Sequence, residues 1–114
     1  MLAIDLTQSG TEDVLFLNGR ITIDSSPELR NRLLAVLHQE TPETVTVNME
    51  GVPYLDCSGI ATLIEALKIA RQHNKTLLLK GLQAPISHFL QATGVLSLFE
   101  TNGDVSAQPK EKVQ

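Results

Sequence analysis

The residues whose side chains are best suited to chemistry lie in the run Tyr54-Leu55-Asp56-Cys57-Ser58-Gly59-Ile60. It places a carboxylate, the chain's single thiol and a hydroxyl at consecutive positions. The run sits where a strand-like segment leads into a helix-like one, and α/β proteins commonly place their sites at such a connection. A helix start presents unpaired N–H groups and the positive end of the helix dipole. This junction can therefore carry or meet an anion.

The same junction has a purely structural interpretation. Asp56 and Ser58 are typical helix caps, Cys57 can fill a small buried space, and Gly59 in the first turn permits close packing. The functional alternative is that the hydroxyl or the thiol is displayed at the helix start. Residue types alone leave both interpretations open.

Catalysis by the junction would need a base beside the nucleophile. A thiol at a helix start can gain reactivity, but His38 and His73 lie near expected helix ends and His88 lies early in a later helix. The sequence places none of them beside Cys57. An enzyme using Cys57 or Ser58 is therefore the least favoured alternative.

A second polar pair, Asp24 and Ser25, precedes the first expected helix, and we expect both side chains to be exposed. Ser25 or Ser26 can cap that helix, with Pro27 in its first turn and Glu28 completing a capping box. The remaining acidic residues are scattered without ligand spacing, and no phosphate-binding glycine loop is present. We expect no metal and no cofactor.

Apolar spacing defines the elements that position these residues. Alternating or continuous apolar runs predict strands near 2–6, 14–17, 44–49 and 76–80. Helical spacing predicts helices over 24–38, 58–73 and 85–93, the last closed by Gly94, while 95–100 could form a helical turn or an edge strand. The first two strands should form a hairpin, and 44–80 should form a parallel βαβ unit.

These elements predict a single small α/β domain, with a mixed four- to five-stranded sheet and helices packed against it. The 114 residues suit one domain, which we place at residues 1–101, and residues 102–114 are expected to form a mobile polar tail. A net charge of −4 and 4% aromatic residues argue against nucleic-acid binding. One cysteine and no long apolar stretch favour a cytoplasmic protein without membrane insertion.

The ordered set of motifs resembles a STAS domain, the family of bacterial anti-sigma-factor antagonists. The resemblance covers about residues 2–100. It is carried by three segments: Gly19-Arg20-Ile21-Thr22-Ile23-Asp24, the junction Leu55–Ile60, and Ala92-Thr93-Gly94-Val95-Leu96 with Leu98-Phe99. It implies a regulatory module that binds a partner acting as both serine kinase and anti-sigma factor.

In the family, the hydroxyl directly after the junction aspartate accepts phosphate from that partner. Here the acceptor position is Cys57, and the next hydroxyl, Ser58, is the candidate acceptor. The resemblance and the exposed side of the second helix imply a partner surface with ten candidate contacts: Asp24, Ser25, Asp56, Cys57, Ser58, Gly59, Ile60, Thr62, Glu65 and Lys68.

The resemblance leaves a second binding role open, because small STAS domains also serve as subunits of lipid-transport ABC ATPase complexes. The altered acceptor position fits that role or a phosphorylation-independent antagonist. A neighbouring gene for an anti-sigma kinase would favour the first role, and one for an ABC ATPase with a permease would favour the second. The sequence does not determine whether the domain self-associates.

Overall fold

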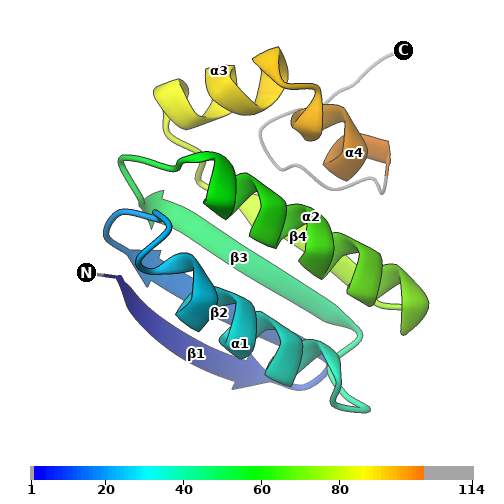
Figure 1. Cartoon of the computed structure of the whole chain (residues 1–114). Coiled ribbons are helices and arrows are strands. Elements are labelled where there is room, and N and C mark those ends of the chain that lie inside the picture. The colour runs from blue at the N-terminus through cyan, green and yellow to red at the C-terminus, as the bar shows by residue number, and fades with distance from the viewer. Residues whose placement is uncertain (1, 102–114) are drawn as a thin grey trace.

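A computed structural model describes the backbone of residues 2–101 and the side chains of residues 2–99. The expected tail, residues 102–114, lies outside the described residues. Within the described part, the elements follow one another in the order β1, β2, α1, β3, α2, β4, α3 and α4 (Figure 1).

The four strands form one mixed sheet in the order β1-β2-β3-β4: β1 (Ala3–Ser9), β2 (Glu12–Asn18), β3 (Thr44–Gly51) and β4 (Thr76–Lys80). The first pair is antiparallel and the other two pairs are parallel. The expected hairpin and the parallel βαβ unit are therefore confirmed, and the sheet has the smaller of the two expected sizes.

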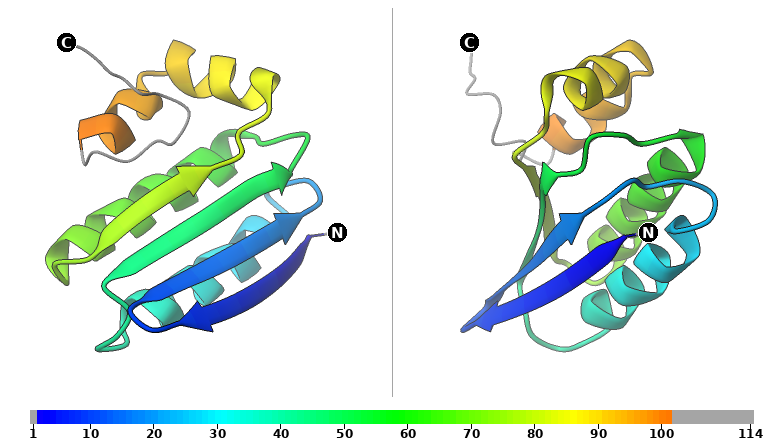
Figure 2. Two further views of the ribbon diagram at one scale, coloured as in Figure 1. Left: turned by 180° about the vertical axis from the view of Figure 1, so that it is seen from behind. Right: turned by 90° about the vertical axis from the view of Figure 1, so that its left-hand side faces the viewer.

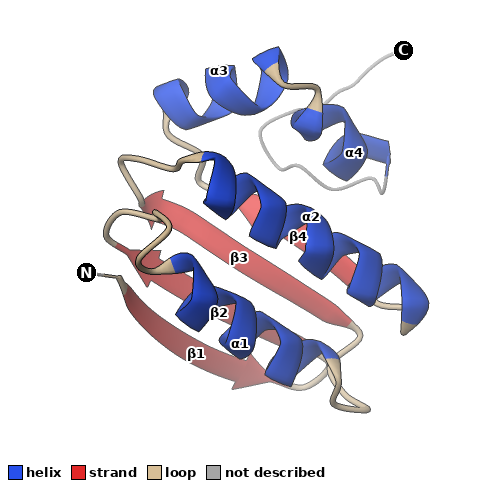
Figure 3. Cartoon of the chain, viewed as in Figure 1, coloured by secondary structure: helices blue, strands red, loops and turns tan. Residues whose placement is uncertain are grey.

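The helices are α1 (Ser26–Leu37), α2 (Cys57–Gln72), α3 (Ala84–Ala92) and α4 (Val95–Thr101) (Figure 3). The segment after Gly94 is thus a helix, not an edge strand. Gly94 has a φ of 80°, the left-handed conformation that a helix end favours, so α3 stops there and α4 starts in a new direction.

The core lies between the sheet and α1 with α2, which cover one face of it (Figure 2). Alternate strand residues point into this layer, and the helices bury an apolar stripe against them, including Leu29, Leu33, Leu63 and Leu67. No described helix covers the opposite face (Figure 2), and there Phe16 is 43% exposed. Helices α3 and α4 lie beyond β4 and bury Phe99.

This topology brings two loops to one edge of the sheet. Strands β2 and β3 are parallel neighbours, so the loops that leave their carboxyl ends, β2–α1 and β3–α2, lie side by side. Both α1 and α2 begin at this edge (Figure 1). Among the described residues, no helix has the length and apolar character that crossing a membrane requires.

The expected capping box on α1 is wrong. Ser25 occupies the cap position, but its side chain makes no capping hydrogen bond. Its hydroxyl instead accepts the N–H of Thr22 at 3.0 Å and donates to the carbonyl of Arg20 at 2.9 Å. The β2–α1 loop is folded back on itself, and Ser25 closes that loop.

Candidate functional site

The two loops are joined through their backbones. The N–H of Ile21 donates to the carbonyl of Tyr54 at 3.0 Å, and the N–H of Asp56 donates to the carbonyl of Ile21 at 3.1 Å. Ile21 and Leu55 form an isolated parallel bridge beyond the sheet. The loops therefore continue the pairing of β2 with β3 and hold each other in a fixed position.

Asp56 is the cap of α2, as the sequence predicts. Its Oδ1 accepts the backbone N–H groups of Ser58 and Gly59 at 2.9 and 3.2 Å, and the hydroxyl of Ser58 at 2.5 Å. Its Oδ2 accepts the N–H of Ile23 at 3.2 Å, so one carboxylate joins both loops. The hydroxyl of Ser58, followed by the backbone donors, lowers the pKa of Asp56 and keeps the group charged.

Ser58 and Cys57 differ in how available their side chains are. The Ser58 hydroxyl donates to Asp56, receives a hydrogen bond from the Ser26 hydroxyl at 3.1 Å, and is part-buried. It thereby links the first turns of α1 and α2. Cys57, the first residue of α2, is exposed with a free thiol, so it is displayed at the surface and fills no buried space.

Gly59 is a packing residue, and its expected place on an open surface is wrong. A Cβ atom there would lie 2.2 Å from Leu55 Cδ1 and 2.7 Å from Ile21 Cγ2. The glycine lets α2 press against the two joined loops. Ile60 and Thr62, also expected at the partner surface, are only 8% and 7% exposed, because both belong to the inward side of α2.

The loop before α1 exposes Asp24 but buries Ser25. Ser25 is 8% exposed, so the expectation of an exposed polar pair is wrong for that residue. Asp24 is held in a tight turn, where its N–H donates to the Thr22 hydroxyl at 3.2 Å. Of this pair, only Asp24 has its side chain exposed to solvent.

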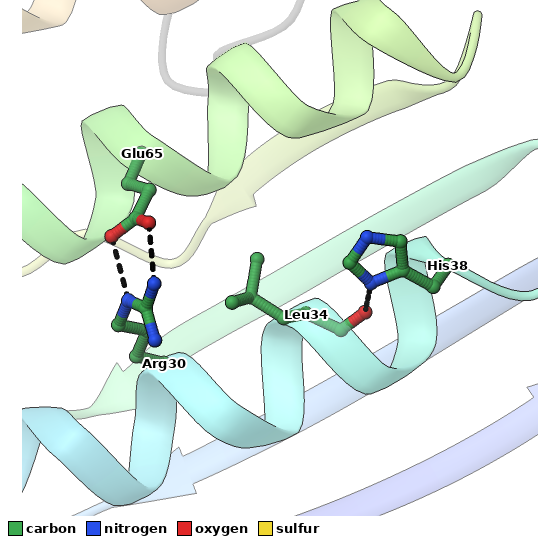
Figure 4. A network of polar contacts seen from close by, with 4 residues as sticks. All are labelled: Arg30, Leu34, His38 and Glu65. Carbon is green, nitrogen blue, oxygen red and sulfur yellow. Dashed lines mark hydrogen bonds and ion pairs between the residues drawn. The ribbon is translucent and has the colours of Figure 1, made fainter.

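Glu65 and Lys68 lie further along α2, away from the loops. Glu65 forms a two-bond ion pair with Arg30 of α1, each bond 2.7 Å long (Figure 4). That hydrogen bonding lowers the pKa of Glu65 and raises that of Arg30. The charge of Glu65 is therefore paired within the chain. Lys68 is exposed.

The structure adds residues that the sequence analysis did not select. Ile23, whose N–H binds Asp56, is 72% exposed, and Tyr54 is 42% exposed with the Arg20 guanidinium 4.4 Å from its ring centre. An open groove of about 370 Å³ begins at Cys57 and runs to α3. Its lining is mainly apolar: Pro53, Tyr54, Leu55, Asp56, Cys57, Pro85, Ile86 and Phe89.

The sequence pointed to this junction through its polar residues, but it did not predict that Ile23 and Tyr54 are exposed there. Ile23 and Tyr54 look like ordinary core residues in a sequence, because apolar type says nothing about exposure. A large apolar side chain left open on a loop that hydrogen bonds hold in place is a feature of binding sites. We refer to Ile23, Tyr54, Cys57 and the groove beside them as the loop-end surface.

The arrangement of these residues suits binding of another molecule better than catalysis or metal binding. In the described part of the chain, no group of three or more His, Cys, Asp or Glu side chains could hold a metal ion. Both carboxylate oxygens of Asp56 serve the loops as hydrogen-bond acceptors. The site is thus a hydrogen-bonded, partly apolar corner with one exposed thiol and one part-buried hydroxyl.

A small mixed sheet with two helices on one face and a helix start at the loop edge defines the STAS class of domains. The family model described as "Mlab, STAS domain" matches residues 4–100. The chain therefore belongs to the STAS domain family.

Individual relatives agree with that assignment. The chain is 30% identical over 84 residues to the anti-sigma-B factor antagonist of Staphylococcus epidermidis, covering 74% of this chain and 77% of the relative. It is 26% identical over 98 residues to the protein of that name from Staphylococcus aureus strain NCTC 8325, covering 83% and 90%.

The fold matches a solved structure as well. It is similar to the crystal structure of an anti-sigma factor antagonist from Mycobacterium paratuberculosis, with a TM-score of 0.81 and 14% identity. That match covers 95% of this chain and 87% of the other. At this identity the likeness describes the fold alone.

Proposed function

We propose that this chain is a regulatory binding module that docks on a kinase-type anti-sigma factor through its loop-end surface. The observation that carries the proposal is the apolar, exposed corner around Cys57 at the start of α2. Its relatives named as anti-sigma-B factor antagonists support the class of partner. Because sigma factors act in the cytoplasm, the proposal places the chain there, as a binding protein without enzymatic activity.

The geometry makes docking favourable because the surface is already ordered. Asp56 fixes the β2–α1 loop and the start of α2 at once, through Oδ2 and Oδ1. A loop that is ordered before binding loses little conformational entropy when a partner covers it. Burial of Ile23 and Tyr54 then contributes apolar contact at the centre of the interface.

Phosphorylation would act on this surface through Ser58. The γ-phosphoryl group of the partner's ATP would pass to Ser58 Oγ, with ADP leaving and the hydroxyl proton passing by way of Asp56 Oδ1, its present acceptor, to solvent, so that Asp56 is charged again. The phosphate adds about −1.5 to −2 charges. Each charge pair about 5 Å from Asp56 costs on the order of 3 kcal/mol at an effective dielectric near 20. Such a penalty would open the junction and release the partner.

Partner capture from source cells tests the docking proposal. Tagged wild type should capture an anti-sigma factor with a kinase domain, and Ile23→Asp should lose it while keeping the wild-type melting temperature. Leu98→Asp is the matched control, because Leu98 is 38% exposed on α4, away from the loops. Equal capture by Ile23→Asp and wild type would place the interface elsewhere. Gly59→Arg is unsuitable, since it would disrupt packing.

Variants of Ser58 test the switch with the captured partner. Ser58→Asp should imitate the released state and bind weakly, whereas Ser58→Ala should bind without regulation by ATP. Affinity is measured by titration calorimetry, and phosphate transfer by mass spectrometry of the chain. Equal affinity of both variants would remove Ser58 from the mechanism.

The position of Ser58 favours a second candidate, a STAS subunit that binds the ATPase of a lipid-transport ABC complex. Its hydroxyl is part-buried between Asp56 and Ser26, and the exposed neighbour is a thiol, which serine kinases do not normally phosphorylate. A docking surface without a phosphorylation switch suits a constitutive subunit. Capture of an ABC ATPase, with no change of Ser58 on incubation with ATP, would favour this candidate.

A further inference from the structure

Two histidines meet at the end of the helix layer opposite the loop-end surface. His38 follows α1 and His73 follows α2, each as the C-terminal cap residue. Their ring centres lie 5.0 Å apart, with the rings nearly perpendicular at 85°. Both residues are exposed. The proposed docking function uses neither side chain.

The ring of His38 is oriented in a way that suits a metal ligand. Its Nδ1 lies 2.8 Å from the carbonyl oxygen of Leu34 (Figure 4). Because a carbonyl only accepts, Nδ1 is the donor in this contact, which leaves Nε2 as the ring nitrogen that faces away from it and can meet a metal ion. Histidines that bind metals commonly use their second nitrogen in this way, to donate to a carbonyl.

The surroundings of the pair favour a cation. Both helices end here, and a helix C-terminus carries a partial negative charge. The backbone N–H of His38 bonds to Leu34 and that of His73 to Ile69, so the positions of both cap residues are fixed by their own helices. An ion between the rings would therefore lie close to two helix C-termini and two imidazole side chains.

We propose that His38 and His73 form a binding site for a divalent transition-metal ion of the zinc, nickel and copper class. Imidazole nitrogen is a preferred ligand for these ions and a poor one for Mg²⁺ or Ca²⁺. Ring centres 5.0 Å apart are close enough for one ion to bind a nitrogen of each ring through bonds of about 2.0–2.1 Å. With two protein ligands, water fills the remaining positions. The ion would fasten the end of α1 to the end of α2.

Thermal unfolding with added metal tests the site. In a Cys57→Ser background, which removes the chain's one thiol ligand, ZnCl2 or NiCl2 at about 0.1 mM should raise the melting temperature by several degrees. MgCl2 should not. His38→Gln and His73→Gln should each abolish the rise, whereas His88→Gln on α3 should keep it, since His88 is the only other histidine. Calorimetry should give one ion per chain.

Three outcomes would overturn the proposal: no rise with either transition metal, an equal rise in the His38→Gln, His73→Gln double variant, or loss of the rise in His88→Gln. All these side chains are exposed, so the variants should fold, and the melting temperature without metal verifies this. The outcome is independent of partner capture, because Ile23→Asp should leave metal binding unchanged.

Discussion

At the scale of single residues, Asp56 organises the site. Its carboxylate accepts four hydrogen bonds, three on Oδ1 from the first turn of α2 and one on Oδ2 from the β2–α1 loop. We expect Asp56→Ala to lower the melting temperature by several degrees, because the first turn of α2 loses its cap. Asp56→Asn should lose less, since an asparagine also caps helices. Calorimetric scans of the three proteins check the order, and an alanine variant as stable as wild type would contradict it.

The same carboxylate gives stability a pH dependence. The pKa of Asp56 is lower in the folded state than the ordinary value, chiefly because of the Ser58 hydroxyl. Its stabilisation is therefore complete above the unfolded pKa of about 3.9 and is lost as the pH falls through the lower, folded-state pKa. Urea unfolding of wild type and Asp56→Asn should differ at pH 7, and the difference should shrink towards pH 3. A constant difference would exclude this linkage.

Position 59 has no room for a side chain, so glycine fits there. A methyl group there would meet Leu55 Cδ1 at 2.2 Å, so Gly59→Ala should cost about 1–3 kcal/mol of unfolding free energy despite the better helix propensity of alanine. Adding Leu55→Ala should remove the closer of the two clashes and leave the one with Ile21 Cγ2, so the double variant should lose less than the sum of the single changes. Urea titrations of the four proteins measure this coupling. Simple additivity would show that the helix had moved instead.

At the scale of elements, α1 is held against the sheet by apolar burial. Leu33 is fully buried beneath α1, and Leu33→Ala should cost about 2–5 kcal/mol. Arg30→Ala breaks the two-bond ion pair with Glu65, but solvent screens that pair and its loss should be far smaller. Urea unfolding compares the two variants. A second series in about 0.5 M salt, which screens exposed charges, should reduce the loss from Arg30→Ala further. A larger loss from Arg30→Ala would reverse the ranking.

At the scale of the molecule, the residues that stabilise the fold and the residues exposed at the loop-end surface lie in different places. The two helices begin at one edge of the sheet, where Asp56 joins the loops, and end at the other, where His38 and His73 meet (Figure 1). Substitutions of the exposed side chains Ile23, Tyr54 and Cys57 should therefore change partner binding with little effect on unfolding. Changes in the buried stripe should do the reverse.

Ile23 tests that separation directly. It is 72% exposed, so Ile23→Asp should leave the melting temperature within about a degree of wild type, as surface changes usually do. Differential scanning calorimetry of the free chain measures this without any partner. A large loss of stability would mean that the loop depends on the Ile23 side chain as well as on its N–H bond to Asp56.

The sequence by itself determined seven of the eight elements in the described part of this fold, and left open whether 95–100 forms a helical turn or a strand. Alternating apolar residues in the strands and the helical stripe Leu29, Leu33, Val36 and Leu37 follow from local periodicity, which needs no knowledge of distant residues. The cap Asp56 and the stop at Gly94 are likewise local, because their partners lie within a few positions. These features, and the family resemblance, could be predicted correctly.

Only the tertiary structure decided which residues are displayed. Glu65 meets Arg30, Ser58 meets Ser26, and Gly59 meets Ile21 across more than thirty positions of the chain. Such contacts depend on how α1 and α2 lie on the sheet, so residue type could not show that Ser25 and Thr62 are buried while Ile23 is open. Exposure is a property of packing between distant segments, and the loop-end surface exists only because two separate loops meet.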